Sequence, residues 1–154
     1  ADVISLDRII NTPPRGIGKT TVATIHRTAL ERSISTWAAV VALSEPKRDR
    51  EGESLSWKRR KQGYLETLSR AEPIALRVSA ADKIHNLGTL LDSLERLGPE
   101  TWRRFRGGPE ASASFYRSVH SLIDERLDEP IVEALGGLVE RLEARAKQDA
   151  EAIA

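Results

Sequence analysis

The stretch that decides the fold is residues 73–97, PIALRVSAADKIHNLGTLLDSLERL. Proline is tolerated in the first turn of a helix, so Pro73 marks a helix start. Gly98 and Pro99 terminate the same helix. Between these limits apolar residues recur at intervals of three and four, which is the period of one helix face. This face contains Leu76, Ala80, Ile84, Leu87, Leu91 and Leu94.

The flanking sequence predicts further helices. A helix is expected from Ser56 onward, a short one over 101–105, another around 115–123, and a last one that Pro130 opens. The string Gly107-Gly108-Pro109 predicts a break. No stretch alternates apolar and polar residues with a period of two, so we expect no strand and an all-α fold. The faces expected to be apolar contain Trp57, Lys61, Tyr64, Leu65 and Leu68 in the first of these helices, and Leu135, Leu138 and Leu142 in the last.

Composition excludes several classes of protein. The chain has 154 residues, no cysteine and a net charge of +1. Disulfides and zinc sites with cysteine ligands are therefore excluded. The charge balance argues against a generic polyanion binder, but it is compatible with a local basic patch. No apolar run approaches the ~18 residues of a membrane span, and the first residues do not resemble a signal peptide. We expect no membrane partner and a cytoplasmic location.

Residues 44–56 are polar, charged and interrupted by Pro46 and Gly52, which predicts a linker or exposed loop. This loop separates a helical segment at 1–43 from a helical half-domain at 57–154. In the first segment, Pro13 and Pro14 end a short helix. A tight turn follows, and a second helix begins at Thr20.

Three polar residues of the long helix, Asp82, His85 and Asn86, stand at positions i, i+3 and i+4. This spacing places them next to one another on one helix face. A carboxylate can bind a divalent metal, and an amide can hydrogen-bond a nucleotide or phosphate. The same three residues equally fit an ordinary solvent-facing surface, so the spacing leaves both interpretations open.

The string at residues 81–87, ADKIHNL, resembles the last metal-ligand motif of HD-domain phosphohydrolases. It is most similar to the motif of SpoT-type hydrolases of guanosine tetraphosphate. Residues 57–65, WKRRKQGYL, are similar to the basic helix of that family, with its pattern W-x-x-R-K-x-x-Y. Trp102, Phe105 and the pair Phe115-Tyr116 follow at a similar distance. The resemblance covers residues 57 to about 145 and implies an HD-domain-like helical bundle.

This resemblance also implies roles for individual residues. Asp82 would be the late ligand of a site for Mn²⁺ or another divalent metal, and Asn86 would contact a nucleotide. Lys58 and Lys61 would face phosphates, and Tyr116 would line the pocket. The metal would lower the pKa of a bound water and supply hydroxide for attack on phosphorus.

The sequence departs from the family where the other metal ligands belong. The family's adjacent His-Asp pair is absent, because the histidines are His26, His85 and His120, and Arg27 follows His26. One carboxylate cannot hold a catalytic metal from water. We therefore expect an incomplete metal site and weak or absent hydrolysis by this chain alone. A second copy of the chain in a homodimer is one source of the missing ligands.

A separate motif, Gly16-Ile17-Gly18-Lys19-Thr20, looks at first like a P-loop. Pro13 occupies the position of the first Walker glycine, and no strand precedes it, so we reject that interpretation. A helix–hairpin–helix fits better, because backbone N–H groups at a helix start suit a phosphate.

Residues 6–22, LDRIINTPPRGIGKTTV, resemble a segment of UvrD-type superfamily 1 DNA helicases, in which the Gly-Ile-Gly turn grips the duplex backbone. This resemblance covers residues 1 to about 43 and reaches no ATPase motif. It implies an alternative function in binding the backbone of duplex DNA. The residues concerned are Arg15, Gly16, Gly18, Lys19 and Thr20.

Together the two resemblances describe a chimera, in which a helicase-like hairpin stands where the front half of an HD domain belongs. We expect the hairpin to pack on the bundle and cover apolar surface. A third alternative is that the chimera is a folded protein without either activity.

Overall fold

The computed structural model describes residues 53–153, and within this range its regular elements are all helical. The predicted all-α class is confirmed for this part of the chain. The elements are α4 (Trp57–Ser69), α5 (Pro73–Leu97), the 3-10 helix η1 (Gly98–Arg104), α6 (Gly108–Asp124) and α7 (Pro130–Ile153).

Several predictions concern residues outside this range. They are the helical hairpin at 1–43, the part of the loop before residue 53, and His26. The alternative DNA-binding residues Arg15, Gly16, Gly18, Lys19 and Thr20 also lie outside the described residues.

Local chemistry sets the limits of α4 and α5. The Ser56 hydroxyl accepts a hydrogen bond from the backbone N–H of Arg59 at 3.3 Å, which caps the start of α4. Pro73 occupies the first turn of α5, as predicted. Gly98 ends α5 with a φ of 67°, a conformation that glycine adopts without a steric penalty, and its N–H bonds to the Leu94 carbonyl.

The connection between α5 and α6 is shorter than the sequence predicts. The short helix η1 begins directly at Gly98 rather than at Thr101, and α6 already begins at Gly108. Pro109 lies in the first turn of α6 instead of breaking the chain. The first turn makes no use of the N–H group that proline lacks, so proline is compatible with a helix start there.

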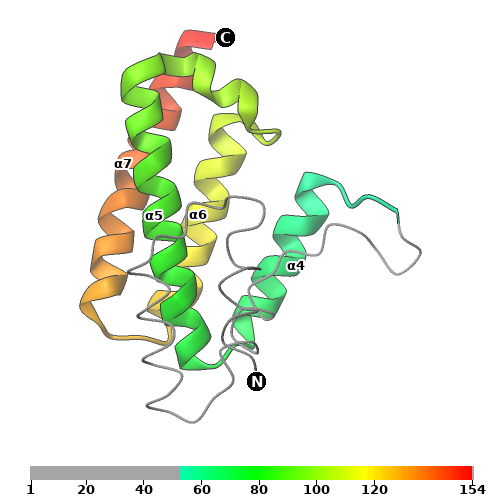
Figure 1. The fold of residues 1–154 in the computed structure, drawn as a ribbon, viewed down its shortest axis with the longest axis vertical. Coiled ribbons are helices and arrows are strands. Elements are labelled where there is room, and N and C mark those ends of the chain that lie inside the picture. The colour runs from blue at the N-terminus through cyan, green and yellow to red at the C-terminus, as the bar shows by residue number, and fades with distance from the viewer. Residues whose placement is uncertain (1–52, 154) are drawn as a thin grey trace, which may run out of the picture.

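The helices α5, α6 and α7 form a bundle in which successive helices run in opposite directions (Figure 1). Helix α7 packs against both α5 and α6, and α4 packs against α6. The predicted apolar face of α5 points into the core, with Ile84 only partly buried. The fully buried large side chains are Leu68, Leu76, Leu87, Leu94, Ile123, Leu135, Leu142 and Val119.

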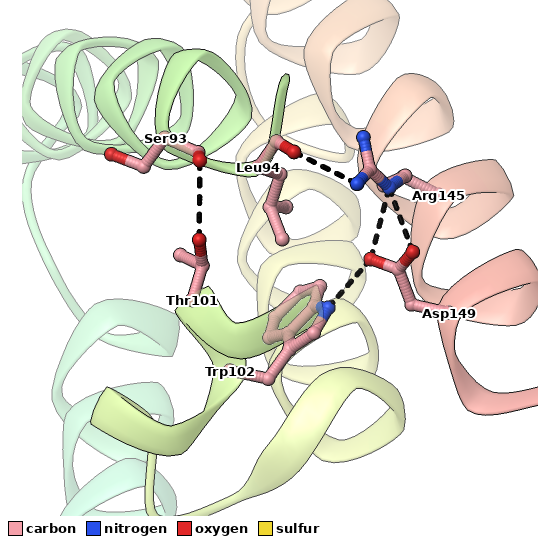
Figure 2. A network of polar contacts seen from close by, with 6 residues as sticks. All are labelled: Ser93, Leu94, Thr101, Trp102, Arg145 and Asp149. Carbon is pink, nitrogen blue, oxygen red and sulfur yellow. Dashed lines mark hydrogen bonds and ion pairs between the residues drawn. The ribbon is translucent and has the colours of Figure 1, made fainter. Parts of the chain in front are cut away.

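A polar network holds η1 against the end of α7 (Figure 2). The indole N–H of Trp102 donates to Asp149 Oδ2 at 2.7 Å, and Arg145 Nε donates to both Asp149 oxygens at 2.9 Å. Arg145 also donates to the Leu94 carbonyl of α5 at 2.8 Å. Three elements are thereby joined around one buried carboxylate, and we call these four residues the Asp149 network.

Arg126, which follows α6, fixes the end of α4. Its guanidinium donates to the carbonyls of Leu68 at 3.4 Å, Ser69 at 3.1 Å and Ala71 at 2.7 Å. The last carbonyls of a helix have no partner within the helix, so a guanidinium is a suitable cap. This cap anchors the helix that carries Lys61.

Candidate functional site

The candidate site is built around two aromatic rings, one from α4 and one from α6. The rings of Tyr64 and Phe115 are both buried and meet edge to face, with centroids 5.8 Å apart. Such a pair stabilises by about 0.5–1.5 kcal/mol beyond its burial. The Tyr64 hydroxyl lies 2.7 Å from the buried Ser79 hydroxyl of α5. The pair therefore marks the junction of α4, α5 and α6.

Two lysines lie over the faces of these rings. The ammonium nitrogen of Lys61 is 4.2 Å from the Phe115 centroid, and that of Lys83 is 4.6 Å from the Tyr64 centroid. The negative face of an aromatic ring attracts a cation at this distance. We call Lys61, Tyr64, Lys83 and Phe115 the lysine–aromatic cluster.

Lys83 is the buried member of the cluster, with a side chain only 10% exposed. Its ammonium donates to Asp82 Oδ2 at 2.6 Å. Burial by itself lowers the pKa of Lys83, but Tyr64, Asp82 and Tyr116 together outweigh burial and raise that pKa above its ordinary value. Lys83 is therefore a permanent positive charge inside the junction, and it does not serve as a proton donor or nucleophile near neutral pH.

The structure gathers three of the predicted site residues here. Lys61 belongs to the cluster, Asp82 pairs with Lys83, and the half-buried Tyr116 lies with its ring centroid 5.4 Å from that of Phe115. Asn86 stands one turn beyond Asp82 on α5 and is half-buried. The remaining predicted residue, Lys58, has an exposed side chain on α4.

The alternative interpretation, a plain solvent face on α5, describes only part of this helix. His85 is exposed, as that interpretation predicts. Asp82 has a side chain 33% exposed, and Asn86 is half-buried, so neither is a plain solvent-facing residue. Asp82 has one oxygen on Lys83 and retains access to solvent.

The described residues do not by themselves fit the divalent metal that the resemblance implies. Within the part of the chain that the structure describes, no group of three His, Asp or Glu residues is placed to hold a metal ion. The carboxylate predicted as a ligand, Asp82, instead lies against the ammonium of Lys83. A lysine ammonium is a donor only, so it neutralises a carboxylate and contributes no metal ligand.

No role was predicted for Lys83 from the sequence, although its position in the pattern of apolar residues indicates burial. Lys83 follows Leu76 and Ala80 and precedes Leu87 at intervals of four, three and four, so it belongs to the buried stripe of α5. A lysine in such a stripe needs a partner, and the preceding residue supplies one. The roles of Ser79 and Phe115 had no comparable signal, because both depend on packing between helices.

Comparisons with known proteins give no match: neither a protein-family model nor a curated protein sequence is similar to this chain. Among the helices in the described range, none combines the length and apolar composition needed to cross a bilayer.

Proposed function

We propose that residues 57–153 form a domain of HD-phosphohydrolase lineage that binds the phosphate groups of a nucleotide, without assembling a manganese site by itself. The observation that carries the proposal is the meeting of two ammonium groups from different helices at one aromatic junction. Lys61 comes from α4 and Lys83 from α5. Asp82 is the acidic partner of Lys83.

In this proposal the residues have separate tasks. Lys61 and Lys83 supply positive potential, which is strengthened because burial removes much of the screening by water. Asn86 offers an amide that donates to a phosphate or base and accepts from a base. Tyr116 offers a ring edge and a hydroxyl at the rim. Lys58, which is exposed one turn before Lys61, contributes longer-range attraction that salt screens.

Nucleotide binding is the first test, by calorimetry with guanosine tetraphosphate and without added metal. We expect measurable binding that weakens at least about tenfold in Lys61→Gln, since a charged hydrogen bond contributes roughly 1.5–3 kcal/mol. Asn86→Ala is expected to weaken binding by a similar factor. The matched control is Thr89→Ala on α5, whose exposed hydroxyl bonds only to the His85 carbonyl within its own helix. Absence of binding, or equal losses in the control, would overturn the proposal.

The metal part of the proposal has its own test. Manganese is titrated into the metal-free protein, with Asp82→Ala alongside. We expect no micromolar binding and no manganese-dependent release of pyrophosphate from guanosine tetraphosphate. Tight binding or robust turnover that disappears in Asp82→Ala would show that the ligand set is completed elsewhere in the chain or by a second copy.

A further inference from the structure

A second charged surface lies at the opposite end of α4 from its Arg126 cap. It joins two segments that are more than forty residues apart in sequence: the start of α4 and the stretch from η1 to the start of α6. The contact that joins them is the Trp57 ring against Gly107, where an added Cβ would lie 2.8 Å from Trp57 Cζ2. Figure 1 shows the start of α4 beside the loop between η1 and α6.

The exposed side chains around this contact are predominantly cationic. We call this surface the η1–α4 basic patch and define it by five exposed residues. Among residues 53–61 and 100–110, five basic and three acidic side chains are exposed, although the whole chain has a net charge of only +1. The patch consists of Lys58, Arg59, Arg103, Arg104 and Arg106.

The exposed acidic residues of these segments, Glu53, Glu100 and Glu110, are fewer than the five cations of the patch. Glu100 pairs with Arg103 at 3.1 Å, but the Arg103 side chain is 80% exposed, so water screens this ion pair strongly. The N-terminus of α4 adds partial positive charge from its backbone N–H groups. The patch therefore keeps an excess of positive charge.

We propose that the η1–α4 basic patch binds the phosphodiester backbone of nucleic acid. Four of its five residues are arginines, whose planar guanidinium groups match phosphate oxygens in a two-pronged geometry. Because phosphate contacts position a protein without reading bases, the binding is independent of sequence. The patch shares Lys58 with the nucleotide-binding proposal, but its four arginines take no part in that proposal, so variants of these arginines test it independently.

An anionic membrane is the less favoured occupant. Peripheral membrane binding needs apolar side chains that insert beside the cations. Here the aromatic residues at the patch pack on the core: Trp102 is buried, and Trp57 and Phe105 are partly buried against it. Among the described residues, Leu97 is the exposed large hydrophobic residue. A single such side chain inserts too little apolar surface into a bilayer to anchor the protein.

The test measures fluorescence anisotropy of a labelled DNA duplex of about 20 base pairs with the full chain, at about 50 and about 200 mM salt. With about four phosphate contacts, affinity should fall by roughly a hundredfold across this range. Arg104→Glu with Arg106→Glu should weaken binding at least about tenfold and reduce the salt slope by about two. Arg104→Lys with Arg106→Lys keeps the charge and should retain most of the binding.

The matched control is Arg70→Glu with Arg141→Glu, which changes charge equally at two other exposed positions. Equal losses in both double variants would overturn the proposal, as would absence of salt-sensitive binding. Binding lost in Lys19→Glu but unaffected in the Arg104 and Arg106 variants would assign DNA binding to the N-terminal hairpin instead. Binding to phosphatidylserine vesicles without binding to the duplex would make the surface a lipid site.

Discussion

The Asp149 network and the lysine–aromatic cluster use the same types of side chain in different ways. The first joins a carboxylate, a cation and one aromatic ring, and the second joins two cations and two aromatic rings, with the carboxylate of Asp82 paired to one of the cations. Asp149 has a side chain 5% exposed, and it accepts from Trp102 Nε1 and, with both oxygens, from Arg145 Nε. Asp82 is 33% exposed, with one oxygen bonded to Lys83. The first carboxylate is saturated inside the fold, whereas the second has capacity left for a ligand.

This difference separates a stabilising role from a binding role. A buried polar network that is fully satisfied rigidifies its surroundings, and removal of one member leaves the others unsatisfied. Lys61, the half-buried member of the lysine–aromatic cluster, can bind phosphate oxygens at little cost to the fold. The largest losses of stability and the largest losses of binding should therefore come from different regions of the bundle.

The largest expected effect is on stability, from Asp149→Ala compared with Asp82→Ala. Removing Asp149 leaves the Trp102 N–H and the Arg145 guanidinium without their buried partner, at a cost of about 3 kcal/mol in the free energy of unfolding. Asp82→Ala should cost less, about 1–2 kcal/mol, because Asp82 is itself partly exposed and Lys83 keeps its contact with the Tyr64 ring. Urea unfolding measures both, with Asp92→Ala at an exposed position of α5 as the control. Costs that agree within about 0.5 kcal/mol would remove the distinction between the two regions.

An intermediate effect is expected for Lys83→Met, which keeps the volume of the side chain and removes its charge. The wild-type chain should be more stable by about 1–2 kcal/mol at neutral pH. The folded-state pKa of Lys83 is raised, so above the ordinary value of 10.5 the unfolded chain loses its proton first. The contribution of the ammonium is complete below that pH and declines above it, by about 1.4 kcal/mol per pH unit at most.

The pH dependence of the stability difference tests this prediction. The stability difference between wild type and Lys83→Met should narrow between neutral pH and about pH 11, as measured by urea unfolding. A constant or widening difference would mean that the charge of Lys83 does not stabilise the folded state.

The smallest expected effect is on stability, from two glycine substitutions in α7 that change no charge. In α7, an added Cβ at Gly136 would lie 2.9 Å from His120 Nε2, whereas one at Gly137 meets no atom within 4 Å. Gly137→Ala should stabilise by about 0.5–1 kcal/mol, because alanine favours the helix. Gly136→Ala should be less stable than Gly137→Ala by about 1 kcal/mol, because His120 must move. Equal melting temperatures for the two variants would show that α6 and α7 do not approach as closely as described.

The sequence by itself determined the elements in residues 57–153. The period of the apolar residues from Leu76 to Leu94 predicted α5, and Pro73, Gly98 and Pro130 set helix limits that the structure confirms. These signals are local, because proline and glycine act through their own backbone geometry. The break predicted at Gly108 and Pro109 was wrong, because α6 begins at Gly108. Proline, which interrupts a helix interior, is compatible with the first turn of a helix.

Only the tertiary structure decided which side chains meet. Lys61 and Phe115 are 54 positions apart, and Trp102 and Asp149 are 47 apart, so no local pattern predicts either contact. The sequence predicted Asp82 as a candidate ligand, but the packing of α5 against α4 and α6 buried Lys83, whose ammonium lies against that carboxylate. The physical reason is that burial fixes the ionic state of a charged group through neighbours from other helices, and those neighbours exist only once the chain has folded.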